Sequence, residues 1–484
     1  MAEYKIVIAN SVGVDSQGYR MIHYPSRWTT GAKRAYFAWY PWELSYLSTL
    51  LKRETKHKVK MLDACLDWLD YKAYLEKVVA EKPDFLVMES STRTIEEDLR
   101  LALEVKKQCG TKLIFTGQHP SAYPEQLKDK VDYICIGEYE FTVLDIIQGK
   151  NEKEIPGLYP NKLRDPFDVT LLPWPEDEDI KRIDYLNPGP PGLRYKQIQA
   201  YGSRGCPYRC IFCVCSNLYY SKANWRPRDP ADIVKEIAYL KNKYGDKMEG
   251  IFFDEESHNF NKKHVIDLCQ KIIDAKLSNL HYTAMCMYNT LDDEMLEIMK
   301  KAGYYQIRVG VETVSEKVAE GIGMKGKLNL DKLYRVLSTA KKLDIEIYGT
   351  FLVGAPNANP EEDMKTINVM KDLLKKELLT ELQISICTPQ PGTPFYNKVE
   401  KEGWLLHKEW QRFDGNTESV VSYPHYPKEK IEEVYKKAVD IGHYYRGLIS
   451  LKKDGYFSTA VKAIKKRGVF GSIKLVIEYL RGKI

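Results

Sequence analysis

Strand-like and helix-like segments alternate along most of this 484-residue chain, and this alternation limits its fold more than any other feature. In the first run, strands are expected at 4–9, 57–64, 84–88, 112–116 and 131–136. Helices are expected at 42–53, 70–81 and 95–108, with a short one near Glu125. Strands separated by helices of this length pair in parallel through right-handed crossovers. Residues 1–148 therefore predict a doubly wound, Rossmann-like α/β domain that binds its ligand at the carboxyl ends of the strands.

Residues 149–195 lose this rhythm and are rich in proline. The prolines are Pro156, Pro160, Pro166, Pro173, Pro175, Pro188, Pro190 and Pro191. Proline at this density opposes both helices and central strands. We therefore expect an interdomain linker here.

The alternation returns from Gln197. Strands are expected at 197–202, 249–254, 280–286, 304–312, 346–353 and 381–388, and helices at 230–243, 261–275, 292–302, 330–343 and 360–377. Six parallel strands with outer helices predict an open, partial (β/α)6 barrel over residues 196–395, with its chemistry at the carboxyl ends of the strands. Residues 396–484 are expected to be helical.

Three cysteines, Cys206, Cys210 and Cys213, follow the first barrel strand at intervals of four and three residues. Three thiolates can ligate three irons of a cubane cluster, so that the fourth iron keeps an open site for a substrate. Structural zinc needs four closed ligands, usually from paired CxxC units, and the chain has no second pair. Chance proximity of buried thiols fits poorly, because Arg204 and Gly205 give the segment loop character. The spacing indicates a 4Fe-4S cluster with one open iron.

This CxxxCxxC motif, with the aromatic Phe212 before its last cysteine, resembles the radical S-adenosylmethionine (SAM) superfamily. The resemblance implies that the open iron chelates the amino and carboxylate groups of SAM. An electron from the cluster then breaks the sulfonium to give a 5′-deoxyadenosyl radical, and the aromatic at Phe212 contacts the adenine. Cys215 departs from the plain motif, as either a spare thiol or a functional one.

Polar residues and glycines lie at the carboxyl ends of three further barrel strands. They are Asp254, Glu255 and Glu256 after the second strand, Arg308, Gly310, Glu312 and Ser315 on and after the fourth, and Gly354 after the fifth. Carboxylates at these ends face the barrel mouth, where one can accept a hydrogen bond from an ammonium group; a solvated acidic loop is the alternative. The resemblance implies that these residues contact SAM. Arg308 is expected to pair with Glu312 or with a bound carboxylate, which guanidinium groups recognise in two-point fashion.

The first domain resembles the cobalamin-binding domain that precedes the barrel in one branch of this superfamily. The residues that carry the resemblance end three consecutive strands: Ser90, Ser91, Thr92, Gly117, Gln118, His119, Gly137 and Glu138. Small residues and hydroxyls at such ends form a slot for a flat nucleotide tail. The resemblance makes this occupant the tail of cobalamin.

One feature of classical cobalamin domains is missing, the Asp-x-His-x-x-Gly motif whose histidine ligates cobalt. The histidines of the first domain are His23, His57 and His119. There are two explanations. In one, the lower face of cobalt is left free or blocked by a side chain, and in the other, the domain has lost cobalamin. We expect that cobalamin binds and that no histidine ligates cobalt. His119 is expected to bond the cofactor tail or its own loop. The aromatic, arginine-rich segment 10–40 is expected to cover the corrin or the substrate mouth, or else to pack on the linker as a partly ordered insertion.

The charge of the chain is concentrated at its end. Residues 456–484 carry seven basic residues against the single Glu478, which equals the net charge of +6 of the whole chain. The remainder is neutral, which argues against a nucleic-acid partner. An apolar stripe beside these cations indicates a helix that packs on the barrel or makes weak, salt-sensitive contact with an anionic membrane. The start of the chain does not resemble a signal peptide, so a cytosolic setting is expected. A cluster of this type is oxygen-labile, which implies an anaerobic or well-protected compartment.

The sequence thus predicts a cobalamin-dependent radical SAM enzyme that methylates an unactivated carbon. In the scheme that the resemblance implies, one SAM recharges cobalamin with a methyl group and a second SAM yields the radical. A flavodoxin or ferredoxin is the expected electron donor. The alternatives are a radical SAM cyclase, coupling or rearrangement enzyme that does not use cobalamin as a methyl donor, or an iron-sulfur redox protein. The substrate is not readable from these patterns.

Overall fold

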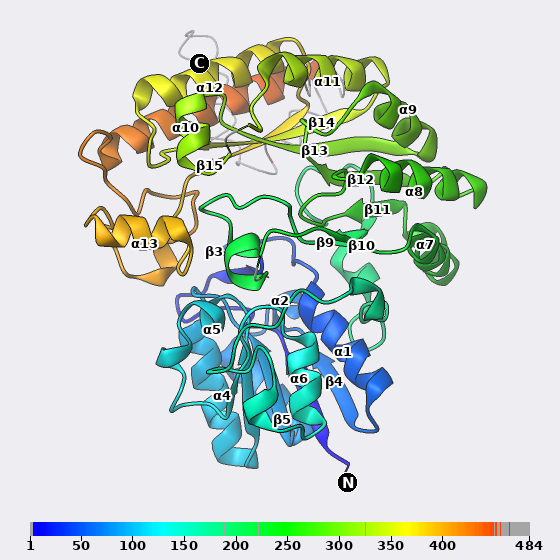
Figure 1. Cartoon of the computed structure of the whole chain (residues 1–484), viewed down its shortest axis with the longest axis vertical. Coiled ribbons are helices and arrows are strands. Elements are labelled where there is room, and N and C mark those ends of the chain that lie inside the picture. Colours follow the sequence, from blue (N-terminus) through cyan, green and yellow to red (C-terminus); the bar gives the residue numbers. More distant parts are fainter. Residues whose placement is uncertain are drawn as a thin grey trace.

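The computed structural model describes residues 3–449 apart from 187, 188, 221 and 325, together with 451, 452, 455 and 464. In this part of the chain two parallel sheets, each covered by helices, lie one above the other (Figure 1). The N-terminal sheet occupies the lower half of the view, and the second sheet with its helices occupies the upper half. Both alternating runs therefore form the predicted α/β architecture.

The first sheet has the order β4-β1-β5-β6-β7, with every pair parallel. Its strands are β1 (Lys5–Ala9), β4 (Lys58–Leu62), β5 (Phe85–Glu89), β6 (Lys112–Thr116) and β7 (Tyr133–Ile134). Its helices are α1 (Trp42–Glu54), α2 (Ala64–Asp67), α3 (Tyr71–Glu81), α4 (Ile95–Cys109), α5 (Gln118–Ala122) and α6 (Glu140–Ile147). The direction of winding reverses between β1 and β5, which is where doubly wound sheets bind ligands. The predicted doubly wound domain is confirmed.

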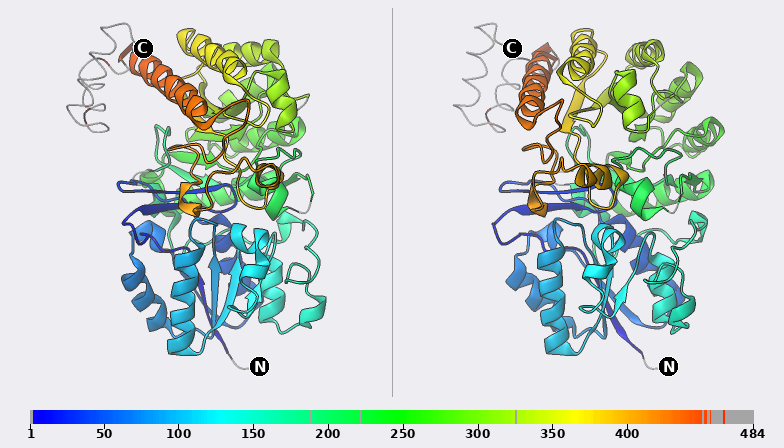
Figure 2. Two further views of the ribbon diagram at one scale, coloured as in Figure 1. Left: turned by 90° about the vertical axis from the view of Figure 1, so that its left-hand side faces the viewer. Right: turned by 60° about the vertical axis from the view of Figure 1, so that its left-hand side comes forward.

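Segment 10–40 forms an antiparallel hairpin of β2 (Arg20–Tyr24) and β3 (Trp28–Ala32). The hairpin lies between the two sheets in both views of Figure 2. Tyr24 is buried and its hydroxyl lies 2.8 Å from that of Tyr201, which follows the first barrel strand. The segment is therefore an element between the domains, and not a loosely packed insertion on the linker.

The second sheet is a partial barrel of six parallel strands in chain order. The strands are β8 (Gln197–Ala200), β11 (Gly250–Phe253), β12 (His281–Cys286), β13 (Tyr304–Glu312), β14 (Glu346–Val353) and β15 (Glu381–Ile386). The outer helices are α7 (Pro230–Tyr244), α8 (Lys262–Asp274), α9 (Asp293–Ala302), α11 (Leu330–Lys342) and α12 (Pro360–Lys375). Within the described residues β8 and β15 do not pair with each other, so the barrel is open as predicted.

Side-chain caps fix where the outer barrel helices begin. Asp229, Asn261, Asp292, Asn329 and Asn359 each accept a hydrogen bond from a backbone N–H in the first turn of the helix that follows. Such a cap typically contributes about 1 kcal/mol. The strand before each helix therefore ends at a defined residue, and the loops at the barrel mouth are held in place.

The linker and the C-terminal region are less regular. Among the described residues of 149–195 there are three short 3-10 turns, at Glu152–Glu154, Val169–Leu171 and Arg182–Leu186. After α13 (Pro394–Lys401) the chain is largely irregular over 402–427, and it is helical again over 428–449. The prediction that residues 396–484 are helical was wrong over 402–427, where Gly403, Gly415, Pro424 and Pro427 favour turns.

The predicted basic tail, 456–484, lies outside the described residues except for Ile464, so its membrane contact stays a prediction. None of the helices among the described residues has the length and apolarity needed to cross a bilayer.

Candidate active site

The three cysteines lie on a loop that is held from several sides. The backbone N–H of Cys213 donates to the carbonyl of Cys210 at 3.0 Å. Asn217 Nδ2 donates to the carbonyls of Cys210 and Cys213 at 2.9 and 2.7 Å. At the start of the loop Arg204 is buried and pairs with Glu140 at 2.5 Å. The sequence therefore folds the three thiols into one fixed segment at the mouth of the barrel.

All three cysteines line one cavity of about 290 Å³. Four of the predicted SAM contacts line it with them, namely Phe212, Glu256, Gly310 and Glu312. Residues that the sequence did not single out also line it, and they are Arg27, Tyr208, Met285, Cys286, Met287, Tyr288, Asn289, Met324, Lys327 and Thr350. A thiol set, an aromatic ring and two carboxylates thus face one space beside the cysteine loop.

Within the described residues, no three His, Cys, Asp or Glu side chains converge on a single ion position. A cubane does not need such convergence, because each cysteine ligates a different iron. One of the three thiols is also prepared for ligation, since a hydrogen bond from Cys215 lowers the pKa of Cys213 to about 6. Burial raises the pKa of Cys206 to about 12, so that thiol needs the metal to lose its proton. The cysteine loop fits a cluster better than a single ion.

Cys215 sits between the cysteine loop and the N-terminal hairpin. Its thiol lies 2.8 Å from the carbonyl of Ser26, in the turn that joins β2 to β3. It therefore tethers the hairpin and also supports Cys213, which gives this extra thiol a positioning role in the fold.

Lys327 brings a cation to the cysteine loop. Its Nζ lies 3.1 Å from Cys210 Sγ and 3.5 Å from the centroid of the Tyr208 ring. A fixed positive charge this close stabilises the more negative, reduced state of a cluster.

We expect Lys327→Met to lower the reduction potential of the reconstituted cluster by on the order of 100 mV. This magnitude is the Coulomb energy of one charge about 7 Å from the cluster at an effective dielectric constant of about 20. Redox titration followed by electron paramagnetic resonance measures this shift. Lys301→Met, at an exposed lysine of α9, is the matched control. An unchanged potential in Lys327→Met would contradict the placement of Lys327 beside the cluster.

Glu312 ends β13 in a strained conformation. Its φ of 61° lies in the left-handed region, and the pairing of β13 with β14 shifts between Gly310 and Glu312. A Cβ at residue 310 would come within 2.8 Å of Glu312 Oε1, so only glycine lets this carboxylate fold back over the strand. Oε1 accepts a hydrogen bond from Thr350 Oγ1 at 2.9 Å. Strain of this kind concentrates at functional sites.

Burial raises the pKa of Glu312 from 4.5 to about 7. Between pH 4.5 and 7 the carboxyl group keeps its proton in the folded state and loses it in the unfolded state. The contribution of Glu312 to the free energy of unfolding therefore falls as the pH rises from about 4.5 through 7. We expect Glu312→Gln to stabilise the ligand-free protein by on the order of 2 kcal/mol at pH 8 and by nothing at pH 4, and to weaken SAM binding. Thermal unfolding at both pH values and SAM titration measure the two effects. Equal stabilisation at both pH values would contradict the assigned cause.

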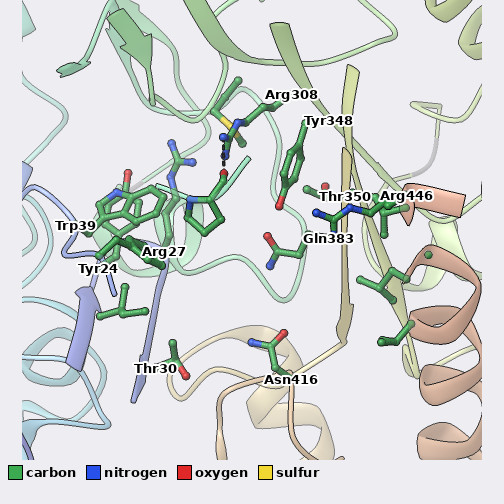
Figure 3. A pocket seen from close by; sticks show the side chains of 18 of the residues that line it. Tyr24, Arg27, Thr30, Trp39, Arg308, Tyr348, Thr350, Gln383, Asn416 and Arg446 are labelled. Atoms are coloured by element: carbon green, nitrogen blue, oxygen red, sulfur yellow. Dashed lines mark hydrogen bonds between the residues drawn. The ribbon is translucent and has the colours of Figure 1, made fainter. Parts of the chain in front are cut away.

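Two predicted SAM contacts, Asp254 and Arg308, line a second cavity beside the first. Asp254 Oδ2 accepts hydrogen bonds from Trp39 Nε1 at 2.9 Å and from Gln199 Nε2 at 3.2 Å. Burial raises its pKa to about 7. Arg308 does not pair with Glu312; its Nη2 donates to the carbonyl of Pro191 at 2.7 Å (Figure 3). Of its two expected partners, Glu312 is therefore ruled out, because the two side chains face different cavities, and a bound carboxylate stays a prediction.

Three other predicted contacts line neither cavity. Glu255 lies 2.6 Å from His258 Nδ1 and accepts from the Gly202 N–H at 3.2 Å, so it holds the barrel strands together. Ser315 caps α10 (Glu316–Gly321) and donates to Glu362. Gly354 is covered by the side chain of Ile431. These positions stabilise the barrel mouth, and Glu256 is the carboxylate after β11 that faces the cysteines.

The strand ends of the first sheet form the predicted slot region. Gly117 has a φ of 101°, and a Cβ there would meet the Ser90 carbonyl oxygen at 2.8 Å. Asp98 accepts from Ser90 Oγ at 2.8 Å and Ser11 Oγ at 2.7 Å, which ties β1 to β5 at the point where the winding reverses. Thr116 Oγ1 is buried there without a partner. Small residues and an unsatisfied hydroxyl at this edge fit a bound tail.

His119 and Glu138, two of the predicted slot residues, have their side chains engaged by other residues of the protein. His119 Nδ1 lies 3.4 Å from Thr92 Oγ1 and its Nε2 lies 3.2 Å from Gln126 Oε1. Burial lowers the pKa of His119 to about 4, so the ring is neutral. Glu138 accepts from Arg226 at 2.9 Å and also pairs with Arg204. Its carboxylate therefore joins the first domain to the cysteine loop.

Comparison with known proteins finds a family match for each of the two sheet-containing parts of the chain. A model of the radical SAM superfamily matches residues 201–370, and a model of the B12 binding domain matches residues 29–147. The chain therefore carries a radical SAM domain in its barrel and a B12-binding domain before it. The cofactors predicted from the sequence, a 4Fe-4S cluster, SAM and cobalamin, are those of such an enzyme.

Several relatives are named as methyltransferases, including two that match most of this chain. The uncharacterized methyltransferase PH0819 of Pyrococcus horikoshii is 27% identical over 429 residues, which are 85% of this chain and 89% of that protein. Bacteriochlorophyllide d C-8(2)-methyltransferase of Chlorobaculum tepidum is 25% identical over 350 residues, covering 68% and 72% of the two chains. Among solved structures, the cobalamin-dependent SAM radical enzyme OxsB, with aqua-cobalamin and SAM bound, has a TM-score of 0.69 over 99% of this chain and 71% of its own, at 15% identity. The likeness to OxsB shows a shared fold.

Proposed function

We propose that this protein is a cobalamin-dependent radical SAM methyltransferase that acts on an unactivated carbon. The observation that carries the proposal is the cavity in which Cys206, Cys210 and Cys213 face Phe212, Glu256 and Glu312. The names of the two methyltransferase relatives support methyl transfer as the outcome.

When bound, the cluster supplies the electron that cleaves SAM, and cobalamin supplies the methyl group. The residues of the chain would position the bound groups and limit the access of water to them. Phe212 would pack on the adenine of SAM. Glu256 and Glu312 would accept hydrogen bonds from SAM. Glu256 is itself fixed by the Gly205 N–H at 3.0 Å and by Tyr220 Oη at 2.8 Å. The hairpin contacts Asp254 and Cys215 at the barrel mouth, where it would limit the access of water.

We include in the proposal an external one-electron donor such as a flavodoxin or ferredoxin, because reductive cleavage of SAM consumes an electron. We also include a cytosolic, low-oxygen setting, because an open iron of a cubane is oxygen-labile.

The test uses the full-length protein, reconstituted with iron and sulfide without oxygen, with and without hydroxocobalamin, and supplied with a chemical reductant and methyl-labelled SAM. We expect 5′-deoxyadenosine in both samples, and S-adenosylhomocysteine only in the sample that holds cobalamin. Absence of 5′-deoxyadenosine would refute a radical SAM enzyme. Absence of S-adenosylhomocysteine alone would refute methyl transfer and favour another radical outcome.

A further inference from the structure

The second cavity has a volume of about 500 Å³ and lies at the open side of the barrel. Its wall combines the N-terminal hairpin, strands β13 to β15 and the helical segment 428–449 (Figure 3). Arg27, Met285 and Thr350 line this cavity and also the cysteine cavity. A molecule in the second cavity therefore adjoins the place where the radical would form.

Arg308 puts a buried positive charge in this wall. Its side chain stacks with Phe252 and Tyr348, with Cζ 4.6 and 4.5 Å from the two ring centroids, and the residue is 6% exposed. Its hydrogen bonds go to the carbonyl of Pro191 and, at 3.4 Å, to Gln306 Oε1. Both acceptors are neutral, and Arg308 forms no ion pair with any carboxylate in the described part of the chain.

An uncompensated buried guanidinium is costly for a folded protein. Burial lowers the pKa of Arg308, although Asp254 and the nearby tyrosines oppose the shift. Asp254 does not neutralise it by contact, because its carboxylate is engaged by Trp39 and Gln199, with Arg27 3.6 Å away. A bound anion would remove this cost. The N–H groups of the Arg308 guanidinium that have no acceptor among the described residues therefore point to an anionic ligand.

The other polar groups of the wall also favour an anion. Arg446 lies across the cavity near Tyr348, Thr350 and Gln383 (Figure 3). Its guanidinium pairs with Glu381, while its Nε is buried without a partner. Asp254 is the one acidic residue of the wall in the described part of the chain, against the three arginines Arg27, Arg308 and Arg446.

Much of the remaining wall is apolar, although Thr30, Gln383, Asn416 and His443 also line it. Ile22 and Phe37 come from segment 10–40, Leu382 and Ile384 from β15, and Val439 from the C-terminal helix. These apolar side chains favour a ligand with a hydrocarbon or aromatic body. The cavity thus combines a largely apolar space with the guanidinium of Arg308, on the side formed by the barrel strands.

We propose that the substrate is an apolar molecule with one oxyanion group, a carboxylate or a phosphate, which binds Arg308 while its apolar body lies between the hairpin and the C-terminal helix. The proposal rests on the proposed function, which makes this cavity the substrate site. In this orientation the part of the body near Met285 and Thr350 is the part that reacts.

The test measures binding without turnover, so that it is independent of methyl transfer. Full-length protein with its cluster and SAM is titrated calorimetrically with octanoate, octyl phosphate and octan-1-ol. We expect at least one anion to bind about 10- to 100-fold more tightly than the alcohol, as a charged hydrogen bond in a buried site provides. The tighter of the two anions identifies the group as carboxylate or phosphate. Equal affinity of all three probes for the wild-type protein would overturn the proposal.

Arg308→Met is expected to remove this preference for anions while it leaves octanol affinity within about twofold, since the apolar wall is retained. Arg308→Lys should keep part of the preference. Arg335→Met, at an exposed arginine of α11, is the matched control and should bind like the wild type. SAM affinity is measured for every variant. A loss of SAM affinity in Arg308→Met as large as the loss for the anions would assign Arg308 to the SAM carboxylate and overturn the substrate proposal.

Discussion

Replacement of Cys206, Cys210 and Cys213 by alanine together is expected to abolish iron binding and reductive cleavage of SAM. The three thiols line the cavity with Phe212 and Glu312 and are the proposed ligands of the cluster, so their removal is expected to leave it without its protein ligands. Iron and sulfide analysis, the visible spectrum and the yield of 5′-deoxyadenosine measure the loss. We expect 5′-deoxyadenosine to fall to the level of a sample without protein.

Cys109→Ala is the control for this triple variant, because Cys109 is a partly exposed thiol at the end of α4. It should retain the full iron content and full SAM cleavage. Far-ultraviolet circular dichroism of the triple variant should match the wild type, since the loop is also held by Asn217 and Arg204. A four-iron cluster that forms in the folded triple variant and cleaves SAM would place the active site elsewhere.

Strong local signals explain why most elements could be predicted from the sequence. The helix expected at 330–343 is observed at Leu330–Lys342, where Asn329 caps its start and leucines and valines recur on one face. The strand expected at 304–312 is observed at Tyr304–Glu312. Parallel strands buried on both faces read as continuous apolar runs, and capped helices separate them.

Elements that depend on distant contacts could not be predicted. The hairpin of β2 and β3 is short, and it is held by bonds from Tyr24 and Arg27 to the Asp254 carbonyl, more than 200 positions away in the chain. The irregular segment 402–427 is held on the barrel by the Ile386 N–H, which donates to the Gly415 carbonyl at 2.8 Å, and by Tyr423 Oη, which donates to the Gly354 carbonyl at 3.0 Å. In both cases tertiary packing decides the structure, and local propensity does not.

The candidate site was predicted by residue type more successfully than by orientation. The sequence placed Asp254, Glu255 and Glu256 at one strand end, but side chains that follow one another point in different directions there. Glu256 faces the cysteines, Glu255 bonds His258, and Asp254 faces the second cavity. Lys327 and Thr350 were missed because neither belongs to a local motif; only folding brings them to the cavity.

The second large effect is expected at the cobalamin site. The full-length protein should bind hydroxocobalamin, and the cob(II)alamin form should lack the superhyperfine splitting that a protein nitrogen on cobalt produces. The motivation is the missing Asp-x-His-x-x-Gly motif together with Gly117 and the buried Thr116 hydroxyl at the strand ends. Electron paramagnetic resonance reads the ligation directly. Failure to bind any corrinoid would remove cobalamin from the proposed function.

The three histidines of the first domain show which side chain could contradict this expectation. His57 Nδ1 accepts from the Tyr4 N–H at 3.2 Å, at the edge of the sheet where β1 begins. Both nitrogens of His119 have partners. His23 is different, because its Nδ1 lies 2.7 Å from Asn10 Oδ1 at the end of β1 while its buried Nε2 has no partner.

Burial lowers the pKa of His23 to about 3, so its ring is neutral and its Nε2 could ligate a metal. We expect no ligation, because the bond to Asn10 and the packing of the hairpin hold this nitrogen inside the protein. His23→Gln should therefore leave the spectrum of the cob(II)alamin form unchanged. A nitrogen splitting in the wild type that disappears in His23→Gln and persists in His119→Gln would show instead that the hairpin supplies the lower ligand of cobalt, from a different segment than the missing motif.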